Sequence, residues 1–439
     1  KNSKKQNTIL VEIYKDINLA KLKTNKIKNL GLFYEENEEG VKVFAGPFLK
    51  SDINLKLDFL IKNGYLNAKK PLNLLFIAII ILFTKQSLAI ESLAKTALVI
   101  DLSTNEVLLE KNSKAKTYPS SMTKMMTALV AFEKIKNGTL SLDQEFLVSK
   151  KAWKMGGSKM FIEVDKRVKV YDLLLGIIVQ SGNDASIALA EGISGSEEIF
   201  AIEMNNLGKK IGLTETNFTN SSGWPDDNHY TTAEDLAKVA EYTIKNHYEL
   251  YQMYKLGDFT YNGIKQDNRN PLLYTFEGSD GFKTGYTEAA GYGLVGSAER
   301  GDRRLIIVLN GLDSSKSRAQ ESLRLMDWGF NNFQLVDFFR KNEVIQEADT
   351  WLGKDNKVDL VALNDISVSI PKAQLSSAKV NVIVEEPIAT PIQKGDQIAK
   401  LQISFADKSA EFPLFSGEDI EQKNFFSRIF SAIYYIILG

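Results

Sequence analysis

Apolar positions recur at helical spacing through the middle of the chain. Met122, Met125, Met126 and Leu129 fall on one helical face, and residues 127–132 are apolar or small nearly all round. A pattern of this kind is typical of a helix buried inside its domain. Further helices are predicted over residues 171–179, from residue 184 through 191, over 197–211, and after the capping residues 231–235.

Strand patterns lie on either side of this helical block. A hairpin is predicted from residues 97–102 and 107–110, which enclose the turn residues 103–105. Three more strands, over 280–286, 292–298 and 305–310, indicate an antiparallel sheet, and a helix over 317–333 follows them. We therefore predict an α/β (α+β) domain over residues 90–335, with an antiparallel sheet and a helical subdomain.

The last hundred residues have a different texture. Short alternating segments separated by polar turns predict a C-terminal all-β domain of sandwich type over residues 336–420, interpreted as a pedestal or interaction module. Residues 421–439 end in aromatic and aliphatic side chains, and a helix of about 21 Å is too short for a hydrocarbon core of about 30 Å. We expect an amphipathic membrane-anchor helix lying in the interface; a helix packed on the β domain is the alternative.

Residues 1–68 predict a small α+β module, because two strand patterns each lead into a helical pattern. The stretch 41–48, with the following helix and Gly64-Tyr65, resembles the SPOR family of peptidoglycan-binding domains. The resemblance implies affinity for cell-wall glycan, and a generic α+β module is the alternative.

Residues 69–89 have the pattern of a signal peptide. Lys69 and Lys70 precede an apolar run over 72–83, and Ala89 ends a small-residue cleavage pattern. We expect export and cleavage after Ala89, with an uncleaved anchor as the alternative; either places residue 90 onward outside the cytoplasm. Since an export signal belongs at an N-terminus, we expect residues 1–68 to be a gene-boundary fusion or read-through.

Composition narrows the chemistry. The formal charge is -1, there are no cysteines, and His229 and His247 are the only histidines among 439 residues. Thiol catalysis, disulfides and multi-histidine zinc sites are excluded, a Ser-His triad is poorly supported, and nucleic acid is not favoured as a partner. No cofactor or metal is expected.

Ser121 and Lys124 stand three residues apart where Pro119 marks a helix start, so they share a face. Burial disfavours the ammonium form of Lys124, which lets its amine take a proton from Ser121 near neutral pH. The Ser121 N–H, at the positive helix end, is suited to holding an oxyanion. The pattern alone is weak, because it also occurs at Ser92, Ser113, Ser369 and Ser376.

Two further motifs follow Ser121 in order: Ser181-Gly182-Asn183 and Lys283-Thr284-Gly285. With them, residues 90–333 closely resemble the low-molecular-mass penicillin-binding proteins that act as serine-type D-alanyl-D-alanine carboxypeptidases. The resemblance extends to residues 118–124, 178–185, 230–235, 280–287, 290–291, Arg318 and 328–329. It implies a penicillin-binding-protein/β-lactamase-like fold and removal of the terminal D-alanine from peptidoglycan pentapeptides.

The resemblance implies four catalytic residues. Ser121 would attack the carbonyl carbon and Lys124 would take its proton, giving an acyl-enzyme that water hydrolyses. Ser181 would relay a proton to the leaving amine. Asn183 would donate a hydrogen bond to the substrate and orient Lys124.

Five residues are candidates for substrate binding. The resemblance implies that Lys283 and Thr284 hold the terminal carboxylate and that the Tyr286 N–H completes the oxyanion hole with that of Ser121. Gly285, on its strand, is expected to let a substrate backbone approach closely. Arg269 resembles a family arginine near the carboxylate, with a surface arginine as the alternative. Asp165 stands in a predicted turn where the family often has glycine.

Two alternative functions are a β-lactamase and a catalytically silent wall-binding scaffold. A β-lactamase needs a deacylating Glu-x-x-x-Asn pattern, and none occurs between Thr214 and Tyr230, so a stable penicilloyl adduct is expected. A catalytically silent wall-binding scaffold is disfavoured because every catalytic position is present. Expected partners are stem peptides ending in D-Ala-D-Ala, β-lactam antibiotics as covalent inhibitors, and the membrane surface. The expected location is the bacterial periplasm, peripheral on the outer face of the inner membrane.

Overall fold

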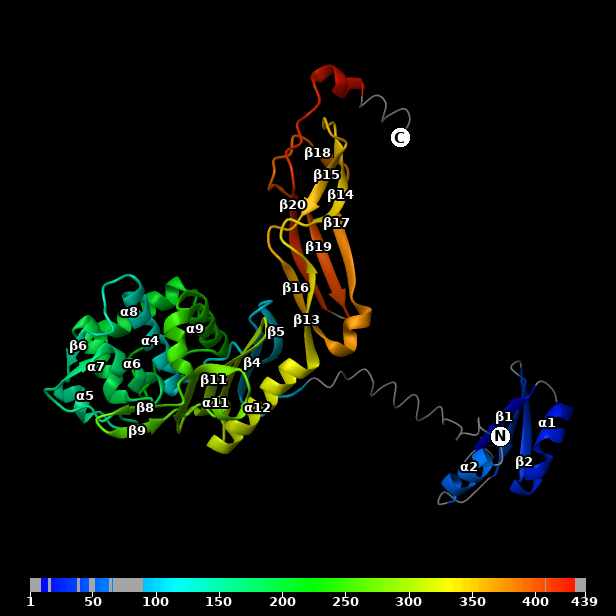
Figure 1. Ribbon diagram of the computed structural model, residues 1–439, viewed down its shortest axis with the longest axis horizontal. Helices are drawn as coiled ribbons and strands as arrows, with labels where there is room; N and C mark the ends of the chain where they lie inside the picture. Colours follow the sequence, from blue (N-terminus) through cyan, green and yellow to red (C-terminus); the bar gives the residue numbers. More distant parts are fainter. Residues whose placement is uncertain are drawn as a thin grey trace. The chain divides into compact units, whose positions relative to one another are not determined.

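The computed structural model describes residues 9–14, 17–37, 40–46, 52–62, 65, 90–406 and 408–430, and the chain divides into two compact units, Lys1–Ile90 and Glu91–Gly439 (Figure 1). The predicted signal segment over residues 69–89 lies outside the described residues. So do the last nine residues of the predicted tail.

The first unit is a small α+β module, as its pattern predicts. Its sheet has the order β1-β3-β2, and β3 is antiparallel to both neighbours, so β1 and β2 run in the same direction. Ile9, Val11, Val41 and Val43 point into a core completed from α2 by Leu60. The elements are β1 (Ile9–Tyr14), α1 (Ile17–Thr24), the 3₁₀ helix η2 (Asn25–Leu30), β2 (Leu32–Asn37), β3 (Gly40–Ala45) and α2 (Ile53–Lys62). Strand β2 was not predicted.

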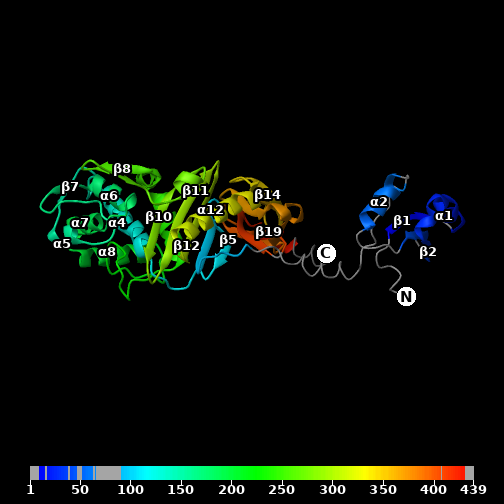
Figure 2. The same cartoon turned by 90° about the horizontal axis from the view of Figure 1, so that it is seen from below.

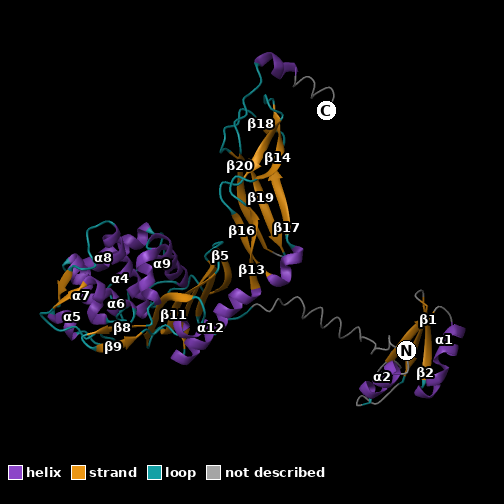
Figure 3. Ribbon diagram, in the orientation of Figure 1, coloured by secondary structure: helices purple, strands orange, loops and turns teal. Residues whose placement is uncertain are grey.

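The second unit begins with the predicted α+β domain, in which sheet and helices are interleaved along the chain (Figure 3). Its strands are β4 (Thr96–Asp101), β5 (Glu106–Lys111), β6 (Glu145–Leu147), β7 (Arg167–Lys169), β8 (Asp258–Tyr261), β9 (Ile264–Asp267), β10 (Ser279–Thr287), β11 (Gly291–Arg300) and β12 (Arg303–Leu312). Its helices are η3 (Ser120–Thr123), α4 (Lys124–Lys136), α5 (Lys150–Lys154), α6 (Val170–Ile178), α7 (Asn183–Ser194), α8 (Glu197–Lys210), α9 (Ala233–Asn246), α10 (Tyr248–Tyr251), η4 (Gln252–Lys255), α11 (Leu272–Thr275) and α12 (Ser315–Asn332).

The principal sheet has the order β10-β11-β12-β4-β5, all neighbours antiparallel, and α12 packs on it (Figure 2). Every residue of β12 is buried, because its two faces meet different layers. Ile306 and Val308 join the core on the helical side, whereas Leu305 approaches Gly329 of α12. A strand buried on both faces reads as a continuous apolar run, which explains the pattern at 305–310.

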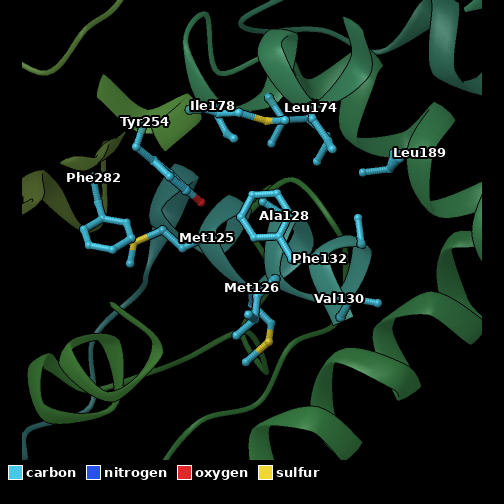
Figure 4. Close-up of a cluster of buried hydrophobic side chains, with 14 of the residues drawn as sticks. Met125, Met126, Ala128, Val130, Phe132, Leu174, Ile178, Leu189, Tyr254 and Phe282 are labelled. Carbon is cyan, nitrogen blue, oxygen red and sulfur yellow. The ribbon is translucent and has the colours of Figure 1, made fainter. Parts of the chain in front are cut away.

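Helix α4 lies at the centre of the helical block, where nine successive residues from Lys124 to Phe132 are buried. Helices α6, α7, α8 and α9 pack around it. The apolar residues that surround α4 in Figure 4 are Leu174 and Ile178 of α6, Leu189 of α7, Tyr254 of η4 and Phe282 of β10. The nearly uniform apolar pattern of residues 127–132 therefore records burial on all sides, as predicted.

The C-terminal part is all-β, in line with its pattern. Strands β13 and β16 form a two-stranded sheet, and a six-stranded sheet has the order β17-β19-β20-β15-β14-β18. The two sheets share one apolar core. The elements are β13 (Phe333–Phe339), β14 (Val344–Trp351), β15 (Lys357–Val361), β16 (Ile366–Pro371), η5 (Lys372–Ser377), β17 (Lys379–Val384), β18 (Ile388–Ala389), β19 (Gln397–Phe405) and β20 (Lys408–Ser416). Strands β13, β14 and β18 were not predicted.

A buried polar cluster joins this β part to the principal sheet. The Ser369 N–H of β16 donates to Glu106 Oε2 at 2.7 Å, and its hydroxyl donates to Asp101 Oδ2. Arg303 of β12 donates to the same Asp101 oxygen at 2.7 Å and to the carbonyl oxygen of Phe333 at 3.1 Å. Because these polar groups hydrogen-bond to one another, they fix the position of the β part on the principal sheet.

Residues 425–430 form a short helical segment of the predicted tail. Phe425, Phe426 and Phe430 are each about 70% exposed there. Among the residues that the structure describes, no helix has the length and apolar character needed to cross a membrane.

Candidate active site

Ser121 and Lys124 lie where a 3₁₀ turn passes into a long helix. Pro119 precedes η3, Ser121 is its second residue, and Lys124 is the first residue of α4. The two side chains meet as predicted, with Lys124 Nζ 3.1 Å from Ser121 Oγ. Ser121 therefore lies just before the N-terminus of the buried helix α4.

Lys124 is 1% exposed, and its amine has three oxygen partners. Besides Ser121 Oγ, Nζ donates to Asn183 Oδ1 at 2.7 Å and to the carbonyl oxygen of Ser222 at 2.6 Å. A neutral amine has two N–H donors and one lone pair, so it can donate to Asn183 and Ser222 while accepting the Ser121 hydroxyl proton. Burial lowers the pKa of Lys124 to about 7, and the charge of Arg269 adds to this effect.

The second motif lies in the connection between α6 and α7. Asn183 begins α7, and its Nδ2 donates to the carbonyl oxygen of Gly156 at 2.9 Å, which turns Oδ1 toward Lys124. Ser181 has φ 68°, in the left-handed region, and its hydroxyl is buried without a hydrogen-bond partner. A strained residue carrying an unpartnered polar atom is often a functional one.

The third motif lies on β10 at the edge of the principal sheet. Lys283 is 2% exposed, and Nζ has one hydrogen bond, to the Thr284 carbonyl oxygen at 3.2 Å. Burial holds the pKa of Lys283 well below its usual range, and the charges of Lys124, Arg269 and Arg318 lower it further. A cation in such surroundings is suited to binding an anion, whose charge would restore the ammonium form.

Arg269 and Arg318 add to this positive region. Arg269 is exposed, its Nη1 donates to Ser158 Oγ at 2.6 Å, and its charge influences both Lys124 and Lys283. Arg318, from α12, is half-buried near Lys283, and its buried Nε has no hydrogen-bond partner among the described residues. Within the described part of the chain, neither these two arginines nor Lys283 forms an ion pair with a carboxylate.

Gly285 also permits a close contact within the chain. A Cβ at this position would lie 3.0 Å from the Pro119 carbonyl oxygen and 3.2 Å from side-chain atoms of Ser120 and Met122. Glycine therefore lets residues 119–122 pack closely against β10, and the close approach of a substrate backbone stays a prediction. Tyr286 is 52% exposed, and its ring stacks on Tyr292.

The sequence analysis did not identify the segment 219–229, which contacts Lys124 and the turn that carries Ser121. It supplies the Ser222 carbonyl oxygen to Lys124. Gly223 has φ 78°, and a Cβ there would lie 1.7 Å from the Ser120 carbonyl oxygen. Buried His229 pairs through Nε2 with Thr123 Oγ1 at 2.8 Å. No motif marks the residues 220–223, Asn-Ser-Ser-Gly, because backbone carbonyl partners leave no trace in side-chain chemistry.

Arg318 was the other omission. Arg318 belongs to the penicillin-binding resemblance but not to the predicted site, and it lies 35 residues beyond Lys283 in the sequence. Within the described residues no cluster of three histidine, aspartate or glutamate side chains is arranged to hold a metal ion. The site contains the Ser121 hydroxyl, the Lys124 amine with its lowered pKa and the unpartnered Ser181 hydroxyl. Lys283 adds a position suited to binding an anion. Together these groups suit acyl transfer.

Comparison with known proteins agrees with this arrangement. The family model described as D-alanyl-D-alanine carboxypeptidase matches residues 83–314, and that described as penicillin-binding protein 5, C-terminal domain, matches residues 333–422. The chain is 37% identical to D-alanyl-D-alanine carboxypeptidase DacC of Escherichia coli (strain K12) over 349 residues, covering 77% of this chain and 87% of the relative.

Solved structures show the same relationship. Penicillin-binding protein 5 from Haemophilus influenzae superposes with a TM-score of 0.70 at 36% identity, covering 76% of this chain and 99% of that one. Penicillin-binding protein D2 from Listeria monocytogenes, in its ampicillin-bound form, superposes with a TM-score of 0.51 at 30% identity, covering 55% and 98%.

The fold and the site together define a serine acyl-transfer enzyme of the penicillin-binding class. The family model spans more than half of the chain, and the relatives are matched over most of their length. The chain belongs to the D-alanyl-D-alanine carboxypeptidase family, whose members are serine-type hydrolases of the cell wall.

Proposed function

We propose that this chain removes the terminal D-alanine from peptidoglycan stem peptides ending in D-Ala-D-Ala, with Ser121 as nucleophile and Lys124 as base. The observation that carries the proposal is the buried Lys124 amine, 3.1 Å from Ser121 Oγ and with a pKa of about 7. An amine with this pKa is both partly deprotonated at neutral pH and a competent proton acceptor.

The reaction proceeds in two acyl-transfer steps. Ser121 Oγ attacks the carbonyl carbon of the penultimate residue and its proton passes to Lys124. The backbone N–H groups of Ser121 and Tyr286 hold the oxyanion. When the C–N bond breaks, the proton passes through the Ser181 hydroxyl to the leaving amine and D-alanine departs. Water then attacks the ester, giving its proton to the same base, and releases the shortened peptide.

The remaining polar groups align the substrate. Lys283 and Thr284 bind the terminal carboxylate, and Arg269 and Arg318 reinforce the positive field there. This assignment is supported by Lys283, Arg269 and Arg318 having no carboxylate partner among the described residues, and by the unpartnered Arg318 Nε. The second Nδ2 hydrogen of Asn183, the first being donated to Gly156, remains for the substrate.

β-Lactams acylate the same serine because they present a reactive carbonyl and a carboxylate at comparable positions. The segment 214–230 supplies Ser222 and His229 to the site, and its carboxylates Glu215 and Asp226 bind Lys116 and the Asn228 N–H. Because this segment lacks the Glu-x-x-x-Asn pattern that supplies a deacylating carboxylate, the penicilloyl adduct persists.

The site's location follows from the flanking segments. The signal-like residues 69–89 direct export to the periplasm, and the aromatic tail holds the enzyme on the outer face of the inner membrane. The exposed Phe425, Phe426 and Phe430 support the second point, because aromatic side chains favour the headgroup level. The SPOR-like module would add affinity for glycan.

The decisive experiment incubates the protein with a synthetic peptide ending in D-Ala-D-Ala and assays free D-alanine. Ser121→Ala should abolish release, and Lys124→Arg should lower it at least about 1,000-fold, since arginine keeps the charge but cannot serve as the base. Lys255→Arg, at an exposed position, is the matched control and should retain activity. Trimming that survives Lys124→Arg would contradict the mechanism, and a wild-type protein that releases no D-alanine would favour the silent scaffold.

A further inference from the structure

A pocket lies beside the residues that precede the nucleophile. It has a volume of about 90 Å³, enough for the end of one side chain. Pro119 and Ser120, immediately before Ser121, line it. The other lining residues are Tyr118, Gly223, Trp224, Pro225, Asp226, Asp227, His229, Thr287 and Ala289.

The residues of β10 give the distance between this pocket and Lys283, which is proposed to bind the substrate carboxylate. Lys283, Gly285 and Thr287 share one face of the strand, and successive residues rise about 3.3 Å, so Thr287 lies about 13 Å from Lys283. Gly285 lies against η3, and Thr287 Oγ1 is 3.1 Å from Ser120 Oγ. A peptide with its carboxylate at Lys283 and its scissile bond at Ser121 therefore continues toward Thr287 and the pocket.

The two ends of this path carry opposite charge. Lys283, Arg269 and Arg318 make the first end positive. At the pocket, Asp226 and Asp227 are exposed, and within the described residues neither forms an ion pair. Asp226 Oδ1 accepts the Asn228 N–H at 2.8 Å, which leaves its second oxygen and both oxygens of Asp227 for a ligand.

The pocket walls suit an aliphatic chain that ends in a cation. Trp224 is 46% exposed and, with Tyr118 and Ala289, supplies apolar surface beside the two carboxylates. Side chains of this kind bury their methylene groups and keep the charged end among polar groups.

We propose that this pocket is a subsite for the side-chain amine of the third stem residue, the residue before the penultimate D-alanine. The inference rests on the proposed carboxypeptidase function and extends it to a substrate class. The enzyme prefers stem peptides whose third residue carries a primary amine, and Asp226 and Asp227 are its specificity-determining residues.

The test compares two peptides, each ending in lysyl-D-Ala-D-Ala, with the lysine amine either free or acetylated. Wild-type protein should hydrolyse the free-amine peptide with a kcat/KM about 1.5- to fivefold higher, the range of an exposed ion pair. Asp226→Asn with Asp227→Asn should remove that preference, so that kcat/KM becomes equal for the two peptides. High salt should reduce the wild-type preference.

The control variant carries Asp302→Asn with Glu385→Gln, an equal charge change at exposed residues away from the pocket, and should keep the preference. Labelling by benzylpenicillin, which lacks the amine, checks that each variant retains a folded site. If the double variant fails that check, Asp227→Asn alone leaves the Asp226 turn intact and should reduce the preference. Equal kcat/KM for both peptides in wild-type protein, or an unchanged preference in the folded variants, would overturn the subsite.

Failure of the carboxypeptidase function itself has a different signature, because neither peptide would then release D-alanine. Calorimetric binding of the same peptides to Ser121→Ala still decides the subsite in that case. Tighter binding of the free amine, lost on replacing Asp226 and Asp227, supports it; equal binding, or none, rejects it.

Discussion

Lys124 Nζ lies 2.6 Å from the carbonyl oxygen of Ser222, a residue 98 positions further along the chain. With Asn183 Oδ1 at 2.7 Å, this contact occupies two donors of the amine and directs the remaining position to Ser121. One partner of Lys124 is thus a backbone atom of the segment 219–229. The position of the Lys124 amine therefore depends on the conformation of that segment.

The pH dependence of acylation should report the Lys124 pKa of about 7. The base is active when neutral, so kcat/KM should be level above that pH and fall about tenfold per unit well below it. Stopped-flow acylation by penicillin between pH 5 and 9 measures this. A midpoint near the ordinary lysine value would show that burial does not tune the base.

Glu197→Gln should move this midpoint to lower pH. The carboxylate of Glu197 raises the pKa of Lys124 by stabilising its ammonium form, so neutralising it lowers the pKa. Glutamine retains an acceptor for the Ser221 hydroxyl, which lies 2.7 Å from Glu197 Oε1. Glu198→Gln, at the exposed neighbour that also pairs with Lys151, is the control and should leave the midpoint in place. Equal shifts in both variants would contradict the prediction.

Gly223→Ala should disturb the nucleophile. Its Cβ would overlap the Ser120 carbonyl oxygen at 1.7 Å, so the 3₁₀ turn carrying Ser121 must shift. We expect at least about a hundredfold slower acylation, since misplacement by about 1 Å costs that much. Gly138→Ala has nearly the same positive φ but nothing within 4 Å, and separates backbone strain from the clash. Similar acylation rates in the two variants would refute the explanation.

Ser369→Ala should loosen the junction of the β part and the principal sheet. The variant leaves Asp101 and Arg303 with one fewer buried partner, at a cost of about 1–3 kcal/mol. Ser409→Ala, at an exposed residue of β20, should change stability by less than about 0.5 kcal/mol. Urea unfolding measures both. Penicillin acylation at 25 °C should be unchanged, because the cluster does not touch the nucleophile.

Asp165→Gly should stabilise the protein. Asp165 lies in the predicted turn with φ 62°, a conformation that glycine adopts without the side-chain penalty. The gain should be at most about 1 kcal/mol, because glycine also makes the unfolded chain more flexible. Thermal unfolding tests this against Asp302→Gly, whose backbone φ is not positive and which should lower Tm. A lower Tm for Asp165→Gly would show that the aspartate has a further role.

The sequence by itself determined the elements and the order of the motifs. Serine and lysine three residues apart must share a helical face, and the uninterrupted apolar run of α4 predicts burial, because both depend on periodicity within one element. The strands of the principal sheet were predicted for the same reason. Strands β2, β6 to β9, β13, β14 and β18 were not, since short or partly exposed strands alternate less clearly and depend on their neighbours.

The tertiary structure alone decided the chemical state and the partners of those residues. The pKa of Lys124, the Ser222 carbonyl beside it, the Arg318 charge near Lys283, and the packing of η3 on Gly285 all join segments far apart in the sequence. Burial, electrostatic fields and close backbone contacts depend on distances in space. Periodicity places a side chain on a face, but only the folded chain determines what that face meets.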